Sequence, residues 1–422
     1  MPPTLQHPGV YVEELKSGVR PITGVATSIT AFVGRALRGP VDTPVTLTSF
    51  GDFERTFGGL WTDSHLGYSV RDFFRLGGST AVVVRVHATA ANDVATVNVG
   101  TGNRQLKLLA ASPGSWGAKL TATVDTEVMD LPAPDPTLFN LTVTDTGSNT
   151  TEVFRNVSFA AGAARRVDLV VNAQSALVRV DTPLPTQPQN APPVTAAASA
   201  NTTDGGAISA PNITTGANFE RDKKGLYALE KTDLFNLLVI PPYNGAGLLP
   251  GAQDVEDQVV TDAIAYAGKR RAVVVLDPPT AWTTPTLAHD GAVAAAYPTS
   301  RNAATYFPRI KQPDPLHAGQ VVQFAPSGAI TGLIAATDAA RGVWKAPAGL
   351  DTVLAGVVEL AVPMSDGDID QLNPIAVNCL RVAAGAGHVM WGARTREGDD
   401  RQGSEWKYLP VRRTALFLEE SL

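Results

Sequence analysis

The segment from Tyr68 to Val86 reads YSVRDFFRLGGSTAVVVRV, and it decides the fold class. Its first half places apolar residues at three-to-four spacing, which predicts a helix that ends at Gly77–Gly78. Its second half, AVVVRV, is apolar enough to be a strand covered on both faces. A buried strand is also expected at Thr27–Gly34 (TSITAFVG), so the order strand, helix, strand predicts an α/β layer.

The same order returns after Gly225. Leu234–Ile240 (LFNLLVI) and Ala272–Leu276 (AVVVL) read as buried strands, each followed by prolines. Between them one apolar stripe predicts a helix that Asp254 caps, and strand–helix–strand order implies a parallel pair. Further helices are expected near Ala288–Tyr297 and Leu350–Val362 and from Val411, with short strands around Leu380, Val389 and Tyr408.

Local capping signals mark other helix ends. Ser49 precedes Asp52 by three residues, which resembles a capping box and predicts a short helix ending at Gly58–Gly59. Asp63 or Ser64 is expected to cap the helix that contains YSVRDFFR. In the last helix we expect Ala415, Leu416 and Leu418 to face inward.

The composition changes between about Ala95 and Gly216, where Thr, Val, Asn and Gly dominate. Turn clusters at intervals of roughly ten residues favour a β-rich module. Pro183–Thr215 has few bulky apolar residues and reads as an extended loop or linker. The candidate strands are Leu120–Val124, Phe139–Val143, Val153–Phe159 and Val167–Val171.

Length and composition exclude several classes of protein. With 422 residues, 44% hydrophobic and 18% charged, the chain is expected to fold into two to four domains. A net charge of −6 argues against general nucleic-acid binding. The N-terminus lacks the pattern of a signal peptide, and no apolar run approaches the roughly 18 residues of a membrane span. The single cysteine, Cys379, is expected to be a buried structural thiol in a chain assembled in a reducing cytoplasm.

No catalytic, cofactor or metal motif stands out. AYAGKRR around Gly268 lacks the other residues of a phosphate-binding loop, and the six histidines show no metal-ligand spacing. The acidic run Asp366, Asp368 and Asp370 lacks the glycine and glutamate of a calcium loop, so a solvated helix cap explains it better. Asp277 follows a parallel strand, where α/β sheets often place functional groups, but no partner base can be named. A rigid turn at the following prolines remains an equal alternative.

Two terminal segments suggest contacts between subunits. In PGVYVEE, Val10 and Val12 alternate with Tyr11 and Glu13, which predicts a short strand that needs a sheet edge in its own chain or in a neighbour. Near the C-terminus Arg394, Arg412 and Arg413 lie among carboxylates, as do Arg396 and Arg401. Mixed charges suit ion pairs between subunits, although an ordinary solvated surface is the alternative.

The ordered set of motifs closely resembles the contractile tail sheath proteins of phages and related injection machines. The similar stretches begin with PGVYVEE, TSITAFVG and DFERTFGG and continue through YSVRDFFRLGG and AVVVRV. Later come VVLDPP, YFPRIKQPDPL, PSGAITGLIAATDAARGVWKAPAG, LNPIAVNCLR, VMWGART and WKYLPVRR. Residues 95–220 lie outside the resemblance, as expected for a variable insertion. Sheath proteins usually continue past a helix like FLEESL, so residues 346–422 are expected to be either truncated at their end or part of a shortened member, and an exchanged C-terminal strand is not expected from residues 1–422.

The resemblance implies a structural, non-enzymatic subunit with no cofactor. Such subunits polymerise helically around an inner tube and contract to drive the tube through a target envelope. The implied partners are further copies of the chain, the inner tube protein, and baseplate and terminator or cap proteins, without direct nucleic-acid contact or membrane insertion. The implied location is the bacterial cytoplasm during assembly, and then a phage tail or injection particle.

The expected architecture is a multidomain α/β sheath fold. Residues 1–20 form an N-terminal arm, and 21–94 with 217–345 form a middle α/β domain. Residues 95–216 form an inserted β-rich peripheral domain, and 346–422 form an inner, tube-proximal domain. Two other functions stay open: an α/β hydrolase-like enzyme near Asp277, and a surface-binding or adhesion module carried by the insertion.

Overall fold

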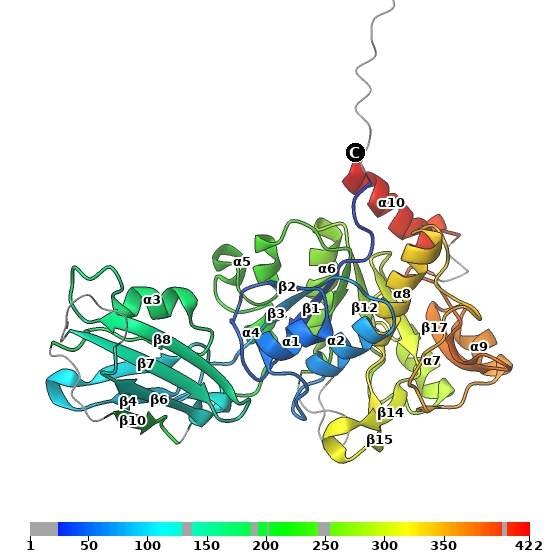
Figure 1. Cartoon of the computed structure of the whole chain (residues 1–422). Coiled ribbons are helices and arrows are strands. Elements are labelled where there is room, and N and C mark those ends of the chain that lie inside the picture. Colours follow the sequence, from blue (N-terminus) through cyan, green and yellow to red (C-terminus); the bar gives the residue numbers. More distant parts are fainter. Residues whose placement is uncertain (1–23, 129–136, 187–192, 201, 244–253, 399–402) are drawn as a thin grey trace, which may run out of the picture.

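The computed structural model describes residues 24–128, 137–186, 193–200, 202–243, 254–398 and 403–422. Figure 1 shows an elongated molecule, with a β-rich lobe at one end and an α/β body that occupies the rest. The last helix, α10 (Leu409–Ser421), lies on the outside of the body. The arm at Val10–Val12 lies outside the described residues.

One eight-stranded mixed sheet forms the frame of the body. Its strand order is β18-β17-β13-β12-β11-β1-β3-β2. The pairs from β3 to β17 are parallel, and the two edge strands β2 and β18 are antiparallel to their neighbours. The strands are β1 (Thr30–Gly34), β2 (Val45–Leu47), β3 (Ala81–Arg85), β11 (Leu237–Val239), β12 (Val273–Leu276), β13 (Ala303–Phe307), β17 (Val377–Ala383) and β18 (Gly387–Met390).

Alternating residues of the central strands enter two different cores. Phe32 of β1 packs in one core, whereas its neighbours Ala31 and Val33 pack in the other. A strand must be apolar along its whole length when both faces are covered, which is the pattern in AVVVRV. The helices of the body are α1 (Phe50–Phe57), α2 (Leu66–Arg75), α4 (Ala210–Ile213), α5 (Phe219–Asp222), α6 (Asp257–Lys269), α7 (Pro285–Val293), α8 (Ser327–Arg341), α9 (Asp366–Leu372) and α10.

Helices α2 and α8 approach each other closely because glycines line their contact. A Cβ on Gly328 would lie 2.2 Å from the Ser69 carbonyl oxygen, and one on Gly332 would lie 2.6 Å from the Phe73 carbonyl oxygen. Real Cβ atoms do not approach backbone oxygen atoms so closely, so only glycine fits at either position. The stretch PSGAITGLIAATDAARG therefore forms a helix whose first half is completely buried.

A three-stranded antiparallel sheet projects from the body beside α2 (Figure 1). Its strands are β14 (Ile310–Asp314), β15 (Gln320–Phe324) and β16 (Glu359–Leu360). Polar side chains connect it to α2: the Tyr68 hydroxyl donates to Asp314 at 2.9 Å, and the Gln312 amide donates to Asp72 at 2.7 Å. These four side chains are buried, so each needs its partner.

The β-rich lobe has its own core of buried side chains between Ala95 and Val180. A four-stranded sheet with order β10-β6-β7-β8 packs beside a three-stranded sheet with order β4-β5-β9. The lobe comprises β4 (Thr96–Val99), β5 (Leu106–Ala110), β6 (Leu120–Asp125), β7 (Leu138–Asp145), β8 (Thr150–Ser158), α3 (Val167–Gln174), β9 (Val178–Val180) and β10 (Val194–Ala197).

The chain leaves the body for the lobe and returns to it at one place. The Gly206 amide donates to the Ala88 carbonyl at 2.9 Å, so the two connecting segments lie side by side. Arg85, at the end of β3, is 2% exposed and donates to the carbonyl oxygens of Ala36, Gly39 and Pro113. Since Pro113 belongs to the lobe, one buried guanidinium joins the lobe to the body.

Several predicted elements differ in the structure. Val167–Val171 lies in α3 rather than in a strand, because Val167 and Val171, four residues apart, both face the lobe core. The 350–362 region is not a helix, because its backbone pairs with β18 through Gly349 N to Met390 O and Leu354 N to His388 O. Pro183–Thr215 contains β10, which pairs with β6, and α4.

The capping and facing predictions are partly corrected. Ser49 caps α1 as predicted, and Gly58 ends it with a φ of 92°. Ser64 accepts from the Leu66 amide at the start of α2, but the residue before α6 is Glu256, because Asp254 is used elsewhere. In α10 Leu416 is buried as expected, whereas Leu418 is 52% exposed. Tyr408 precedes α10 and makes only a single bridge, to Arg394.

The predicted boundary at residue 345 does not coincide with a break between sheets. β13, before the boundary, pairs directly with β17, after it. How either part lies relative to an inner tube stays a prediction. Over the residues that the structure describes, no helix has both the length and the apolar character required to cross a bilayer.

Candidate functional site

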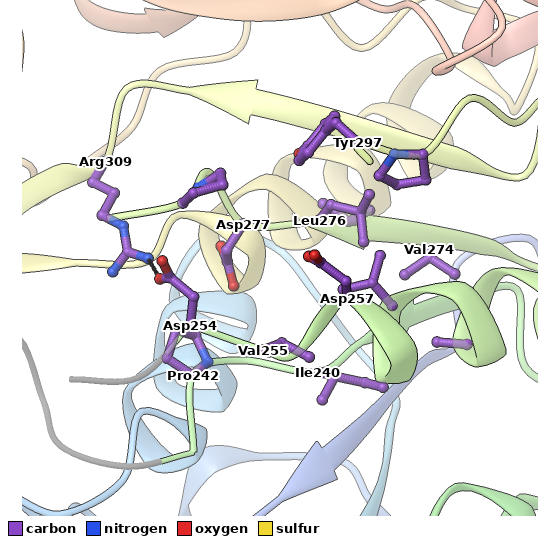
Figure 2. A pocket seen from close by; sticks show the side chains of 15 residues that line it. Ile240, Pro242, Asp254, Val255, Asp257, Val274, Leu276, Asp277, Tyr297 and Arg309 are labelled. Atoms are coloured by element: carbon purple, nitrogen blue, oxygen red, sulfur yellow. Dashed lines mark hydrogen bonds and ion pairs between the residues drawn. The ribbon is translucent and has the colours of Figure 1, made fainter. Parts of the chain in front are cut away.

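A pocket lies at the carboxyl end of β12, the edge where open α/β sheets place ligands. Its apolar floor comes from β11, β12 and α6, including Ile240, Val274 and Leu276 (Figure 2). The polar residues at its rim are Asp254, Asp257, Asp277, Tyr297 and Arg309. The enzyme hypothesis pointed to this place through Asp277.

The carboxylate of Asp277 is occupied by the start of α8. One oxygen accepts the Ser327 amide at 2.8 Å and the other accepts the Ser327 hydroxyl at 2.8 Å. Burial raises the pKa of Asp277 to about 6, against the lowering effect of Arg309 and of the two Ser327 bonds. Asp277 thus satisfies an unpaired amide of the first turn of a helix, as capping carboxylates do.

Arg309 and Asp254 form a second fixed pair beside Asp277 (Figure 2). Arg309 Nη2 lies 2.7 Å from Asp254 Oδ1, and Arg309 Nε donates to the Pro278 carbonyl. The other Asp254 oxygen accepts the amide and hydroxyl of Thr280. These contacts explain why Asp254 does not cap α6: it holds the turn that follows β12.

The arrangement does not bring a nucleophile together with a base. Ser327 donates directly to Asp277, with no histidine between them, so the order of a Ser–His–Asp relay is not present at this pair. His65, at the start of α2, is buried, and burial together with Arg309 lowers its pKa to about 3. Among the described residues that line the pocket, the geometry supports capping and turn formation.

The described residues contain no group of three His, Cys, Asp or Glu side chains placed to hold a metal ion. Asp366 and Asp368 lie in the first turn of α9, where Ser365 and Asp368 form a capping box. The interpretation of this acidic run as a helix cap is confirmed. Cys379 is buried as expected, and burial raises the pKa of its thiol to about 12.

The predicted contact arginines lie in different surroundings. Arg413 is 3% exposed, and its two terminal nitrogens donate to the carboxylate of Asp338 at 2.8 and 2.5 Å. One of these nitrogens also donates to the Thr27 carbonyl. Arg412 is 5% exposed, and its Nε donates to Asn302. Arg394 is half-buried and donates to the Gly398 carbonyl. The structure therefore brings none of these three together, and their contact with another subunit stays a prediction.

Sequence reasoning did not identify the roles of the residues that organise this end of the body, although it noted Arg396 among the charges near the C-terminus. Arg396 is 4% exposed and donates to the carbonyl oxygens of Pro298, Ile375, Ala376 and Ala292, so it fastens β17 to α7. Asp338 has no local signal, because its partner is 75 residues away. Ser327 directly after Pro326 is a possible helix start, and that signal was available.

Comparison with known proteins identifies the central part of this fold. A family model described as the phage tail sheath protein central domain matches residues 235–396, which include β11 to β18 and the Asp277 pocket. Residues 235–396 are a tail sheath central domain. The tail sheath protein of Burkholderia phage BcepMu is 24% identical, with 98% of this chain and 79% of the relative covered.

Solved structures show the same fold. The sheath tail protein of Listeria innocua has a TM-score of 0.60 at 14% identity, covering 94% of this chain and 75% of that one. The sheath tail protein of Desulfitobacterium hafniense has a TM-score of 0.58 at 14% identity, covering 98% and 81%. The resemblance to contractile tail sheath proteins and the α/β sheath fold are confirmed.

Proposed function

We propose that this subunit polymerises helically around an inner tube and that the polymer shortens to drive the tube through a target envelope. The observation that carries the proposal is that both carboxylate oxygens of Asp277 accept hydrogen bonds from Ser327 at the start of α8. The best catalytic candidate in the sheath central domain is instead a cap that fixes α8 against the end of β12. A rigid α/β body of this kind can rotate as a unit between two packings, as contraction requires.

The proposed partners are other copies of the chain, the inner tube protein, and baseplate and terminator or cap proteins. Assembly is proposed to take place in the bacterial cytoplasm, before the particle is complete. The chain needs no cofactor, membrane insertion or direct nucleic-acid contact for this role. Its net charge of −6 supports protein partners over nucleic acid.

The arm around Val10, Tyr11 and Val12 is proposed to add to a sheet edge in an adjacent subunit. Backbone hydrogen bonds to a neighbour's sheet persist while whole bodies rotate. Replacing Val10 and Val12 with Pro removes two backbone donors, so we expect polymerisation to fail while the monomer stays folded. A double mutant that assembles normally would show that the arm is not the link.

The proposed placement puts residues 346–422 next to the tube and 95–216 at the periphery. The lobe lies at the far end of the molecule from β17 and α9, which supports this order (Figure 1). Cryo-electron microscopy of the assembled sleeve tests it. Density for 95–216 against the tube would refute it.

Electron microscopy of the full-length protein, expressed with its tube protein, tests the function. We expect tubular sleeves, and their absence under all assembly conditions would overturn the proposal. The enzyme alternative predicts that Asp277→Asn abolishes a measurable activity without changing stability. The adhesion alternative predicts that removal of the lobe abolishes surface binding, whereas a sheath subunit without it still polymerises.

A further inference from the structure

A cleft with three arginines lies where the lobe meets the body. On the body side it is lined by Arg38, Gly39 and Arg55, and on the lobe side by Ser112, Thr150 and Arg179. No acidic residue is among the described residues that line it. We name this feature the arginine cleft.

The walls of the arginine cleft are fixed relative to each other. The Gly39 amide donates to the Ser112 hydroxyl at 3.0 Å, directly across the junction. Arg38 spans the same junction: Nη1 donates to Asp145 of the lobe at 3.2 Å, and Nη2 donates to the Arg55 carbonyl at 3.1 Å. Because these bonds fix the position of one wall relative to the other, the cleft is preformed, and a ligand need not open it.

The arginines of the cleft have unused binding capacity. Arg179 Nη1 donates to the carbonyl oxygens of Ser175 and Val178, and no carboxylate of the described residues lies within ion-pair distance of its guanidinium. Arg38 Nε is buried without a hydrogen-bond partner. Among the described carboxylates Arg55 pairs with Asp52 alone, and its side chain is 73% exposed. A guanidinium presents five donors, so Arg179 and Arg55 can still bind an anion.

Two carboxylates of the lobe, those of Glu152 and Asp145, are already occupied. Glu152 accepts the Ser175 hydroxyl and the Ala176 amide, which hold it against the lobe. Asp145 is 4% exposed at its side chain and pairs with Arg38. Neither carboxylate is therefore free to neutralise Arg179.

We propose that the arginine cleft binds a carboxylate-bearing segment of a second copy of this chain, with Arg179 as the principal cation. This inference rests on the proposed polymerisation. Acidic side chains outnumber Lys and Arg by 40 to 34 in each copy, so a neighbouring subunit offers carboxylates in excess to the guanidinium of Arg179, which has no ion-pair partner among the described residues. Arginine suits this task because its planar fork binds a carboxylate through two parallel hydrogen bonds.

The first experiment uses the isolated full-length subunit and citrate as a carboxylate probe. We expect citrate to raise the melting temperature above that in sodium chloride of equal ionic strength, since a ligand that binds the folded state stabilises it. Arg179→Glu should lose most of this rise. Arg155→Glu is the matched control, because Arg155 is exposed on β8 outside the cleft. An equal rise in all three proteins would overturn the proposal.

The second experiment measures assembly with the tube protein. We expect Arg179→Glu to raise the subunit concentration needed for sleeves about tenfold, the effect of losing one charge-assisted contact, and Arg155→Glu to leave it unchanged. A photo-crosslinking residue in place of Thr150 should form a link to an Asp- or Glu-containing peptide of another copy. Mixing isotope-labelled with unlabelled subunits distinguishes such links between copies from links within one chain. Wild-type concentration dependence in Arg179→Glu, or links only within one chain, would overturn the proposal.

The two experiments separate this inference from the proposed function. If the wild-type protein forms no sleeves, polymerisation is wrong, and the citrate melts still decide whether the cleft binds carboxylates. If the wild-type and Arg179→Glu proteins form sleeves equally well, the function stands and the cleft proposal is wrong.

Discussion

Replacing Arg413 with methionine tests whether this arginine stabilises its own subunit or reaches a neighbour. Its guanidinium holds Asp338 through two hydrogen bonds, and each side chain of the pair is 3% exposed. The substitution leaves a carboxylate buried without its cation, which costs about 3–5 kcal/mol of unfolding free energy. The Thr27 carbonyl also loses a donor, so we expect the upper part of this range.

Urea denaturation of the isolated subunit, followed by circular dichroism, measures this loss. Arg271→Met is the matched control, because Arg271 pairs at 2.9 Å with Glu420 of α10, the helix that carries Arg413, but its side chain is 50% exposed. An exposed pair contributes less than about 1 kcal/mol, so the control should unfold almost like the wild type. The double variant Arg413→Met, Asp338→Leu should recover part of the loss, because no unpaired charge then remains.

The opposite result would refute this reasoning. If Arg413→Met loses less than about 1 kcal/mol and assembly nevertheless fails, Arg413 acts between subunits, as the sequence predicted. Sedimentation of sleeves formed with the tube protein supplies that second measurement.

Three further predictions concern the body. Because the pKa of Asp277 is raised to about 6, the folded state holds the proton of this carboxyl more tightly than the unfolded state does. The free energy of unfolding should therefore fall by at most about 3 kcal/mol as the pH rises from 4 to 6. Asp277→Asn should remove this fall in denaturation measured at each pH. Gly328→Ala should destabilise by more than about 2 kcal/mol in the same assay, because its Cβ meets a backbone oxygen, whereas Gly162→Ala, with open space around it, should not. Tyr68→Phe should cost about 1–3 kcal/mol and increase hydrogen exchange in β14, because Asp314 loses a buried donor; unchanged exchange would contradict a role for this bond in holding the projecting sheet.

Elements with local signals were predictable from the sequence. Ser49 and Gly58 set both ends of α1, because a cap and a left-handed residue act within one turn of the helix. β3 was equally clear, because a strand covered on both faces is apolar throughout. The run VDLVV at 167–171 could not be assigned by periodicity alone, since a buried strand and a short buried helix have the same composition.

The sequence predicted individual residues of the candidate site but not their partners. The position of Asp277 after a parallel strand was correct, but its partner Ser327 lies 50 residues away. Arg413 was recognised as an arginine on a rigid helix, yet Asp338 decides that it is buried, and no spacing in the sequence links these two residues. Contacts of this kind depend on how β12, α8 and α10 pack, which local patterns do not contain.

The hydrogen bond between Ala88 and Gly206 has a consequence for how this protein can diversify. A segment whose two ends touch places no length requirement on what lies between them, so a whole lobe can be exchanged, enlarged or deleted without moving a strand of the frame. Arg85 then sets one condition on a replacement, because the carbonyl oxygen that Pro113 offers its guanidinium here must be supplied by the incoming module. Grafting a foreign domain between residues 88 and 206 would thus display a new exterior at a regular spacing along an unchanged polymer.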